Sequence, residues 1–464
     1  MALDPSAFET IVPSRYITFT LPNPLLHLNH FTATLLRIAV IDSPSGATAQ
    51  TTIGAMLVPP FRESDWTFST ESGHLQLILA FPHLSRLVLI GNCPDSPRAT
   101  SHKPPSPTDD TSEIEDALMP LMIALCPKEA FRRTGGGLPR IPFLSYEDKV
   151  IQIRVLETCF GNRVGEIAVE DVELEAENGG REFRRRLRFK RTPNLIQTQV
   201  RIHPESLDFE NLEAMKFQAD NRVLVHPYLT PMVAGLSVIA SHLDGLIRTG
   251  IRPKALCLGV GGGALLSFLN SQLGFEVLGV EEDDRVLEMA RKYFGLEEDG
   301  ESIRLCVGDG MDMIRKLYIG AGKNQNHDLS NAKDDGVKFD VIMVDLDSAC
   351  TGAGMSAPPT EFVHKSTLSA AKRLLSEHGA IIVNVMPLCE QFYETLVSEF
   401  QDVFEELYEI DVADDENVVV IATASKIRRD SGDSGKSFLS KLDCVIQGSS
   451  YLDSIRAVSK NVVR

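Results

Sequence analysis

Strands and helices alternate along the second half of the chain, from about Asn221 onward. Apolar runs of strand length recur, and amphipathic segments of helical length separate them. The predicted strands lie within 254–263, 275–283, 303–310, 339–347, 380–387, 406–411 and 417–424, and the helices within 229–248, 264–273, 284–296, 311–317, 365–379 and 390–404. This alternation predicts a doubly wound α/β domain, with a seven-stranded, mostly parallel sheet that ends in an antiparallel pair.

Short β-rich runs occupy the first half of the chain. Pro, Ser and Gly divide them between residues 26 and 91, and those between 149 and 202 are typical of antiparallel strands with turns at Gly161 and 178–180. A Pro- and Ser-rich segment near 94–113 is predicted to be a disordered loop. The predicted divisions are an N-terminal extension (1–25), a β-rich α+β domain (26–205), the doubly wound domain (206–425), and a linker with a short C-terminal helix (426–464).

The net charge of −18 argues against nucleic acid or an anionic membrane as the main partner, since both repel an acidic protein. A basic partner is the natural complement. The strongly basic segment 184–191 is interpreted as a solvated strand face.

The eight cysteines form no C-x-x-C pair, and the N-terminus has no leader-like apolar stretch. We therefore expect a soluble, cytoplasmic protein with reduced thiols.

A glycine-rich turn follows the first strand of the doubly wound domain. Gly259, Gly261, Gly262 and Gly263 stand between this strand and the next helix, where glycine permits tight turning and close approach of a ligand to the backbone. Glu281 ends the following strand about 20 residues on, the position from which a carboxylate binds ribose hydroxyls. The pattern predicts a nucleoside cofactor.

Acidic residues also end the third and fourth strands. Asp309, followed by Gly310, is placed to accept a hydrogen bond from an adenine amino group, and Asp345 ends the fourth strand. Acids at three successive strand ends suit a cationic sulfonium better than an anionic pyrophosphate. We therefore predict S-adenosyl-L-methionine as the cofactor and no metal ion, although each acid taken singly is also a common turn residue.

The stretch FDVIMVDLDSACTGAGMSAPP, residues 339–359, contains the candidate catalytic residues. Asp345 and Asp347 follow a strand apolar enough to be buried on both faces, so they emerge at the rim of the sheet, where ligands bind. Strand alternation predicts that both point to the same side. In isolation they could be metal ligands or turn residues, but beside a sulfonium cofactor they are predicted to orient an acceptor amine.

Several of these segments resemble one known family. The segments GVGGG, VEEDDRVLEMARKYFG, VGDGMDMI and FDVIMVDLDS with GMSAPPTEFV, together with the upstream VPPFRESDWTF, PFLSYEDKV and FRRRLRFKRTPNLIQTQVR, are similar to the methyltransferase-like protein 13 family. Its members are lysine and N-terminal methyltransferases of translation elongation factor 1-alpha. The resemblance spans roughly residues 50–424 and implies a Rossmann-like, S-adenosylmethionine-dependent N-methyltransferase.

The resemblance also implies residue roles. It places Gly259, Gly261 and Gly263 at the methionine moiety, Glu281 at the ribose, and Asp309 with Gly310 at the adenine. It also implies that the loop 348–359 forms part of the acceptor pocket. This loop includes Ser348, Met355, Ser356 and Pro358. The implied partner is the N-terminus of elongation factor 1-alpha, which begins Gly-Lys-Glu-Lys after methionine removal and suits a narrow acidic channel.

Two departures from related patterns keep alternatives open. The long family members have a further N-terminal domain assigned to lysine methylation, and this chain has no second glycine-rich cofactor turn, so the resemblance implies N-terminal α-amine methylation only. The catalytic half is also similar to spermidine synthases, but Gly262 replaces the Asp of their cofactor turn and the segment 223–232 lacks the Glu of their Tyr-His-Glu string. Aminopropyl transfer and a non-catalytic binding module remain alternative functions. Separately, the β-rich domain and the helix from Thr230 are compatible with a homodimer.

Overall fold

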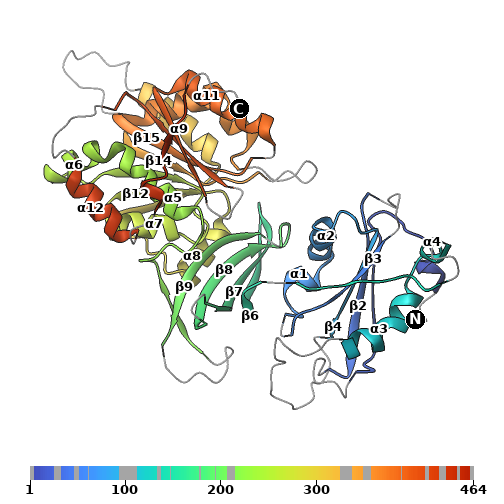
Figure 1. Ribbon diagram of the computed structural model, residues 1–464. Helices are drawn as coiled ribbons and strands as arrows, with labels where there is room; N and C mark the ends of the chain where they lie inside the picture. Colours follow the sequence, from blue (N-terminus) through green and yellow to red (C-terminus); the bar gives the residue numbers. More distant parts are fainter. Residues whose placement is uncertain are drawn as a thin grey trace. The chain divides into compact units, whose positions relative to one another are not determined.

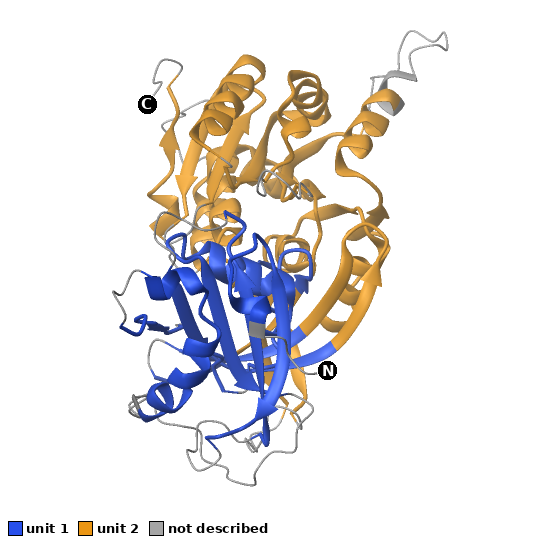
Figure 2. Cartoon of the chain, turned by 90° about the vertical axis from the view of Figure 1, so that its right-hand side faces the viewer, with its two compact units in different colours: residues 1–156, 170–182, 188–196 blue, residues 157–169, 183–187, 197–464 orange. Residues whose placement is uncertain are grey.

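The computed structural model describes residues 5–25, 33–45, 52–60, 62–93, 112–132, 137–146, 148–176, 179–193, 195–205, 215–323, 337–348, 357–387, 389–412, 417–427, 435–446 and 450–459. The chain divides into two compact units, coloured in Figure 2. Unit 1 contains residues 1–156, 170–182 and 188–196, and unit 2 contains residues 157–169, 183–187 and 197–464. Unit 2 therefore includes two short segments that precede residue 197.

Unit 1 is built on a five-stranded mixed sheet with the order β1-β2-β4-β3-β5. β2 is antiparallel to β1 and β4, whereas β3 is parallel to β4 and β5. The strands are β1 (Tyr16–Pro22), β2 (Leu35–Asp42), β3 (Ile53–Leu57), β4 (Arg86–Asn92) and β5 (Phe143–Leu144). The helices are η1 (Pro5–Phe8), α1 (Trp66–Ser69), α2 (Glu71–Leu79), α3 (Ser112–Ala124) and α4 (Lys128–Arg132). β1 lies within the segment 1–25 that the sequence predicts as an extension.

Both faces of this sheet are buried. Ile38 and Val40 of β2 belong to the same apolar core as Leu118 of α3, whereas Ile41 belongs to a second core with Leu77 of α2. Successive side chains of a strand point to opposite faces, so neighbouring residues of β2 enter different cores. Unit 1 is therefore a sheet with helices packed on both faces.

A second five-stranded sheet has the order β10-β9-β8-β7-β6. Its residues are divided between the two units. The strands are β6 (Val150–Gly161), β7 (Gly165–Glu175), β8 (Arg181–Phe189), β9 (Ile196–Pro204) and β10 (Phe217–Asp220). The β-rich region predicted from the sequence thus contributes to two separate sheets.

Two arginines of the basic segment 184–191 are buried. Arg185 is 8% exposed and Arg188 is 5% exposed. Within unit 1, Arg188 Nη2 lies 2.7 Å from Asp65 Oδ1 and 2.6 Å from Glu170 Oε1. The interpretation of this segment as a solvated strand face is wrong for these two residues, because carboxylates at distant sequence positions bind the Arg188 side chain inside the protein.

Unit 2 contains an eight-stranded sheet with the order β13-β12-β11-β14-β15-β17-β16-β18. The five strands from β13 to β15 are mutually parallel, and the pairs β15–β17, β17–β16 and β16–β18 are antiparallel. The strands are β11 (Lys254–Leu258), β12 (Glu276–Glu281), β13 (Ile303–Val307), β14 (Phe339–Val344), β15 (Leu375–Val385), β16 (Glu406–Asp411), β17 (Val418–Thr423) and β18 (Arg456–Ala457). The predicted doubly wound sheet with an antiparallel edge pair is confirmed, and the two-residue β18 adds an eighth strand.

Helices cover both faces of this sheet. Figure 1 shows α9 and α11 on one side of β14 and β15, with α6 and α12 on the other. The helices are α5 (Leu229–Ala234), η2 (Gly235–Ile239), α6 (Ala240–Arg248), α7 (Ala264–Phe268), η3 (Leu269–Leu273), α8 (Asp284–Tyr293), α9 (Gly310–Lys323), η4 (Thr360–Val363), α10 (Lys365–Leu374), α11 (Glu390–Val403), α12 (Lys436–Val445) and η5 (Ser450–Leu452). All six residues of β14 are buried, as its apolar composition predicts.

The segment Leu229–Arg248 is long and apolar enough to cross a membrane by length and composition alone. In the structure 56% of its most apolar stretch is buried. A Cβ atom on Gly235 would lie 3.0 Å from Ile421 and 3.1 Å from Ile382 of the sheet, so packing against the sheet accounts for its apolar character.

The predicted loop near 94–113 falls mainly outside the described residues, which leave out residues 94–111. The predicted domain boundaries at 26, 206 and 426 remain predictions.

Candidate functional site

The glycine-rich turn, Glu281 and Asp345 meet at the carboxyl ends of the parallel strands of unit 2. Gly259 follows β11 and donates its N–H to the carbonyl of Val280 in β12, 2.9 Å away. Asp345 follows β14 and donates its N–H to the carbonyl of Leu258 in β11, also at 2.9 Å. Because these strands are parallel neighbours, their carboxyl ends bring together the glycine-rich turn, Glu281 and Asp345.

The glycines of the turn are required by the packing of the chain on itself. Gly259, Gly261 and Gly263 have φ angles of +85°, +52° and +81°. A Cβ atom on Gly259 would lie 2.0 Å from the backbone oxygen of Asp345, and one on Gly261 would lie 2.3 Å from Thr198 Oγ1. The sequence predicts these glycines from ligand approach, and the structure adds that the turn folds tightly against β14 and β9.

Thr198 of β9 is a contact of the turn that the sequence did not indicate. Its Oγ1 accepts the N–H of Gly262 at 2.9 Å, and the residue is 7% exposed. Thr198 lies more than 60 positions before Gly262, so only the fold brings the two together. The hydroxyl holds the glycine-rich turn in place at the start of α7.

Glu281 faces the same turn. Its Oε2 accepts the N–H groups of Val260 and Gly261, both at 3.1 Å, and its Oε1 accepts that of Glu282 at 3.0 Å. Burial raises the pKa of Glu281, although the backbone N–H groups act to lower it. The carboxylate is thus rigidly placed at the end of β12, where the sequence predicts a ribose contact.

Asp283 connects this edge to the turn between β6 and β7. Its Oδ2 accepts the N–H groups of Arg163 at 2.6 Å and Val164 at 3.1 Å, all within unit 2. A Cβ atom on Gly161 would lie 2.5 Å from the same oxygen. Asp283 also caps α8 through its Oδ1, which accepts the N–H of Arg285 at 3.0 Å.

Asp309 and Gly310 lie at the start of α9. Asp309 Oδ1 accepts the N–H of Asp312 at 2.8 Å, a helix N-cap contact. Gly310 is buried beside Leu258 and Leu346. The structure therefore supports the turn and cap role of Asp309, and its adenine contact remains a prediction.

Two side chains hold the carboxylate of Asp345. Its Oδ2 accepts the hydroxyl of Tyr228 at 3.1 Å, and its Oδ1 accepts the Asn384 amide at 3.0 Å. Asn417 in turn donates to Asn384 Oδ1 at 2.7 Å. Burial, with a smaller contribution from the charge of Asp347, raises the pKa of Asp345 to about 6, against the lowering by the Asn384 and Tyr228 hydrogen bonds. A carboxylate with this pKa is mainly ionised at neutral pH and accepts a proton more readily than an exposed one.

The remaining acceptor residues are only partly described. β14 ends at Val344, one residue before Asp345, and the expectation that Asp345 and Asp347 point to the same side remains a prediction. Asp347 and Ser348 are half-buried. Pro358 is buried, and its neighbour Ala357 pairs with Met386 just beyond the carboxyl end of β15. Met355 and Ser356 lie outside the described residues.

A small cavity opens between the glycine-rich turn and Asp345. Its lining comes from β9, from the segment before α5, and from the turn: Gln197, Thr198, His226, Tyr228, Leu229, Gly259, Val260, Ala264, Leu265 and Asp345. Two buried side-chain atoms of these residues, His226 Nδ1 and Gln197 Nε2, have no hydrogen-bond partner among the described residues. Burial lowers the pKa of His226 to about 3, so its imidazole is neutral. Unpaired buried polar groups are costly, and a bound polar ligand would satisfy them.

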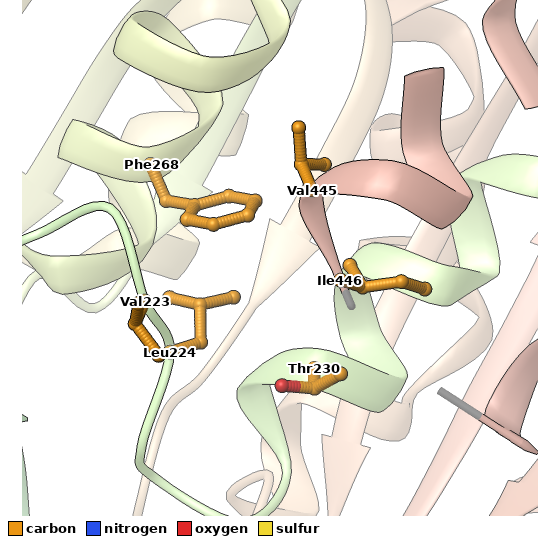
Figure 3. A pocket seen from close by; sticks show the side chains of 6 residues that line it. All are labelled: Val223, Leu224, Thr230, Phe268, Val445 and Ile446. Carbon is orange, nitrogen blue, oxygen red and sulfur yellow. The ribbon is translucent and has the colours of Figure 1, made fainter. Parts of the chain in front are cut away.

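A second cavity of about 250 Å³ lies beside the segment that leads into the site. Figure 3 shows Val223 and Leu224 of this segment, Thr230 of α5, Phe268 of α7 and the Val445–Ile446 end of α12 around one space. The C-terminal helix α12 thus borders the same α7 that begins at the glycine-rich turn.

Among the described residues no group of three or more His, Cys, Asp or Glu side chains is arranged to hold a metal ion.

No protein-family model matches the chain. Curated proteins named eEF1A lysine and N-terminal methyltransferase are similar to it: the one from Danio rerio is 27% identical over 387 residues, and the one from Homo sapiens is 25% identical over 392 residues. Each alignment covers 80% of this chain and 50% of the relative, so the chain spans about half the length of these curated relatives. The resemblance predicted from the motifs is confirmed.

Two solved structures with low similarity in shape were also found. One is human methyltransferase-like protein 13 in complex with SAH, which is 24% identical, has a TM-score of 0.39 and covers 51% of this chain and 97% of its own. The other is a probable spermidine synthase from Corynebacterium glutamicum, 11% identical, with a TM-score of 0.41 and coverage of 66% and 90%. The assignment of the doubly wound fold is based on the strand order of unit 2 itself.

Proposed function

We propose that the chain is an S-adenosylmethionine-dependent N-methyltransferase whose acceptor is the N-terminal α-amine of translation elongation factor 1-alpha. The names of the curated relatives support the reaction class and the acceptor protein. The observation that carries the proposal is Asp345, a half-buried carboxylate with a pKa near 6 that borders a cavity together with Gly259 of the glycine-rich turn. This arrangement suits the transfer of a group from a cofactor to an amine.

The described residues fit the cofactor. Backbone N–H groups hold Glu281 where the ribose contact is predicted, the turn 259–263 offers backbone groups for the methionine moiety, and Asp309, between β13 and α9, stands where the adenine contact is predicted. Gln197 Nε2 is a donor without a partner in the same cavity, suited to a carboxylate or hydroxyl oxygen. When bound, S-adenosylmethionine supplies a methyl group on a positively charged sulfur.

Asp345 acts on the acceptor amine in this proposal. Only a neutral amine has the lone pair that forms the new N–C bond, and methylation leaves a proton to be removed. The Asp345 carboxylate accepts an N–H of the amine and draws this proton away, while Tyr228 and Asn384 keep its two oxygens in position. No other group in the described part of the cavity combines an ionised oxygen with this degree of positioning.

An α-amine suits such a site better than a lysine. With the ordinary pKa values, about a third of α-amines but only about 0.1% of lysine side chains are neutral at cellular pH. A single carboxylate with a pKa near 6 offers modest acid–base assistance, and an α-amine requires little. The acidic net charge also favours the lysines at the second and fourth positions of the acceptor peptide. With this acceptor, we propose a cytoplasmic location for the chain.

A peptide assay tests the proposal. The purified chain is incubated with S-adenosylmethionine and a peptide that begins Gly-Lys-Glu-Lys, and mass spectrometry locates each added methyl group. We expect methylation of the α-amine and none after N-terminal acetylation. Methyl groups on lysine would contradict the α-amine assignment. In a parallel reaction, decarboxylated S-adenosylmethionine and putrescine test aminopropyl transfer, and its occurrence without peptide methylation would replace the proposed reaction class.

A further inference from the structure

A third cavity, of about 180 Å³, lies near the amino ends of the parallel strands of unit 2, whereas Asp345 lies at their carboxyl ends. Thr423 ends β17 and pairs with Ala380 of β15, and Asp340 stands at the start of β14, so these residues mark the amino ends of the central parallel strands. The lining comes from η2, α6, β15 and the end of β17: Val238, Ile239, Ser241, His242, His378, Thr423, Ser425, Lys426 and Ile427. None of these residues belongs to the site proposed for methyl transfer.

The apolar part of the cavity includes a buried hydroxyl. Val238, Ile239 and Ile427 supply aliphatic surface, and Thr423, which is 1% exposed, lies among them. Thr423 Oγ1 has no hydrogen-bond partner among the described residues. A buried hydroxyl without a partner is unfavourable, so a ligand that contacts this oxygen would recover the lost hydrogen bond.

Hydrogen-bond donors surround the more exposed part. Lys426 supplies an exposed ammonium group, and Ser241 and Ser425 supply hydroxyls. The imidazoles of His242 and His378 lie with their ring centroids 5.8 Å apart, and His378 Nδ1 is 3.0 Å from Ser425 Oγ. The Lys426 ammonium is the charged donor among them, and it favours a ligand with a carboxylate oxygen.

The two neighbouring carboxylates are already engaged. Asp340 Oδ1 lies 2.7 Å from His242 Nε2 and accepts the Ser376 hydroxyl at 3.0 Å, and its Oδ2 accepts the N–H of Lys254 at 2.9 Å. Glu406 Oε2 accepts the N–H of Ile427 at 2.8 Å. These bonds hold both acids in place, and the Lys426 ammonium lies on the exposed side of the lining.

From these contacts we infer a second ligand site that binds a small organic carboxylate with an apolar ring or branched chain. The apolar body packs on Val238, Ile239 and Ile427, and the carboxylate meets Lys426 and accepts the Thr423 hydroxyl. The cavity is large enough, because an apolar cavity of about 150 Å³ holds a benzene ring. The site is independent of the reaction proposed above.

Benzoate is the probe that tests the site, with benzamide as its uncharged counterpart. Saturation-transfer NMR and calorimetry on the full chain are expected to give a benzoate Kd of about 1 mM or below and at least fivefold weaker binding of benzamide. Thr423→Val removes the hydroxyl at nearly constant volume and is expected to weaken benzoate at least threefold, whereas Thr423→Ser restores it. Lys426→Met is expected to remove the preference for benzoate over benzamide.

Matched controls separate a site effect from a folding effect. Thr367→Val alters another buried threonine, at 3% exposure in α10, and leaves benzoate binding unchanged. Circular dichroism and thermal unfolding confirm that each variant is folded. Equal benzoate affinity in the wild type, Thr423→Val and Lys426→Met would overturn the inference, as would equal affinity for benzoate and benzamide or no binding of either.

Discussion

The hydroxyl of Tyr228 donates a 3.1 Å hydrogen bond to Oδ2 of Asp345, across 117 positions of sequence. Tyr228 immediately precedes α5, and its ring stands edge-on to that of His226 at 4.5 Å between centroids. Asn384 holds the other carboxylate oxygen of Asp345. The acid that the sequence identifies at the fourth strand end is therefore positioned by two side chains from different elements.

Asp345→Asn is expected to reduce methyl transfer at least 100-fold while it stabilises the fold at pH 8. The pKa of Asp345 is near 6 in the folded chain, above its value in the unfolded chain. The protonated acid therefore favours folding below about pH 4, and this contribution is lost as the pH rises through 6. An amide avoids the burial of charge, and stability at pH 8 should rise by roughly 1–3 kcal/mol. Urea unfolding at pH 5 and pH 8 measures the difference; a variant with full activity would remove Asp345 from the mechanism.

Tyr228→Phe is expected to move the acidic limb of the rate profile. The hydroxyl stabilises the ionised form of Asp345, so its loss raises the pKa of that carboxyl above about 6. A hydrogen bond to a charged group corresponds to a shift of about one pH unit. The pH dependence of kcat/KM between about pH 5 and 9 tests this. Tyr393→Phe, which removes a hydroxyl bound to Glu409 instead, serves as the control and should leave the profile unchanged.

Glu281→Ala is expected to weaken S-adenosylhomocysteine binding at least tenfold in calorimetry. The substitution removes the predicted ribose contact together with the acceptor of the Val260 and Gly261 N–H groups. Glu282→Ala is the matched control, because Glu282 is exposed and lies 3.8 Å from Arg163. Similar affinities for the two variants would reject the cofactor position.

Gly259→Ala is expected to be far more harmful than Gly274→Ala. Both glycines have φ near +80°, which costs an alanine about 1–2 kcal/mol. A Cβ atom has open space at Gly274 but lies 2.0 Å from the Asp345 backbone oxygen at Gly259, so the end of β14 must shift. We expect a total loss above about 3 kcal/mol and loss of cofactor binding for Gly259→Ala only. Urea unfolding and calorimetry compare the pair, and equal losses would show that backbone strain alone matters.

Arg188→Met is expected to destabilise unit 1 by about 3–5 kcal/mol, because it removes the buried cation that Asp65 and Glu170 share and leaves Asp65 with Arg62 alone. The sole tryptophan, Trp66, follows Asp65 and is 9% exposed, so its fluorescence reports the unfolding of this unit. Arg132→Met, at an exposed ion pair with Glu129, is the control and should change stability by less than about 1 kcal/mol. A loss in Arg188→Met no greater than in the control would show that the buried network is dispensable.

The sequence was sufficient to predict the sheet of unit 2, because its periodicity is local. The alternation of apolar strands and amphipathic helices defines a doubly wound fold, and the order of β11 to β17 agrees with it. In the first half the same kind of reasoning merged two sheets, since short β-rich runs do not indicate which strands pair. The burial of Arg188 was missed because its partners, Asp65 and Glu170, are distant in sequence.

At the site, the residues at strand ends were predictable and their supporting contacts were not. Gly259, Glu281 and Asp345 follow strands in a recognisable pattern, and the structure brings them to one edge. Thr198 and Asn384 carry no local signal, because threonine and asparagine in strands usually have other roles. Only tertiary structure places a hydroxyl beneath Gly262 and an amide beside Asp345.

The contact of Asp283 with the turn at Arg163 and Val164 bears on how small a working fragment can be. A shortened chain that begins at residue 206, the predicted start of the doubly wound domain, would lack that turn and also Thr198. Oδ2 of Asp283, in a side chain 1% exposed, would lose both N–H donors next to Glu281. We therefore expect that a shortened chain must begin no later than Glu157 to keep this contact. Glu157, in the β6–β7 hairpin, is the first residue of unit 2.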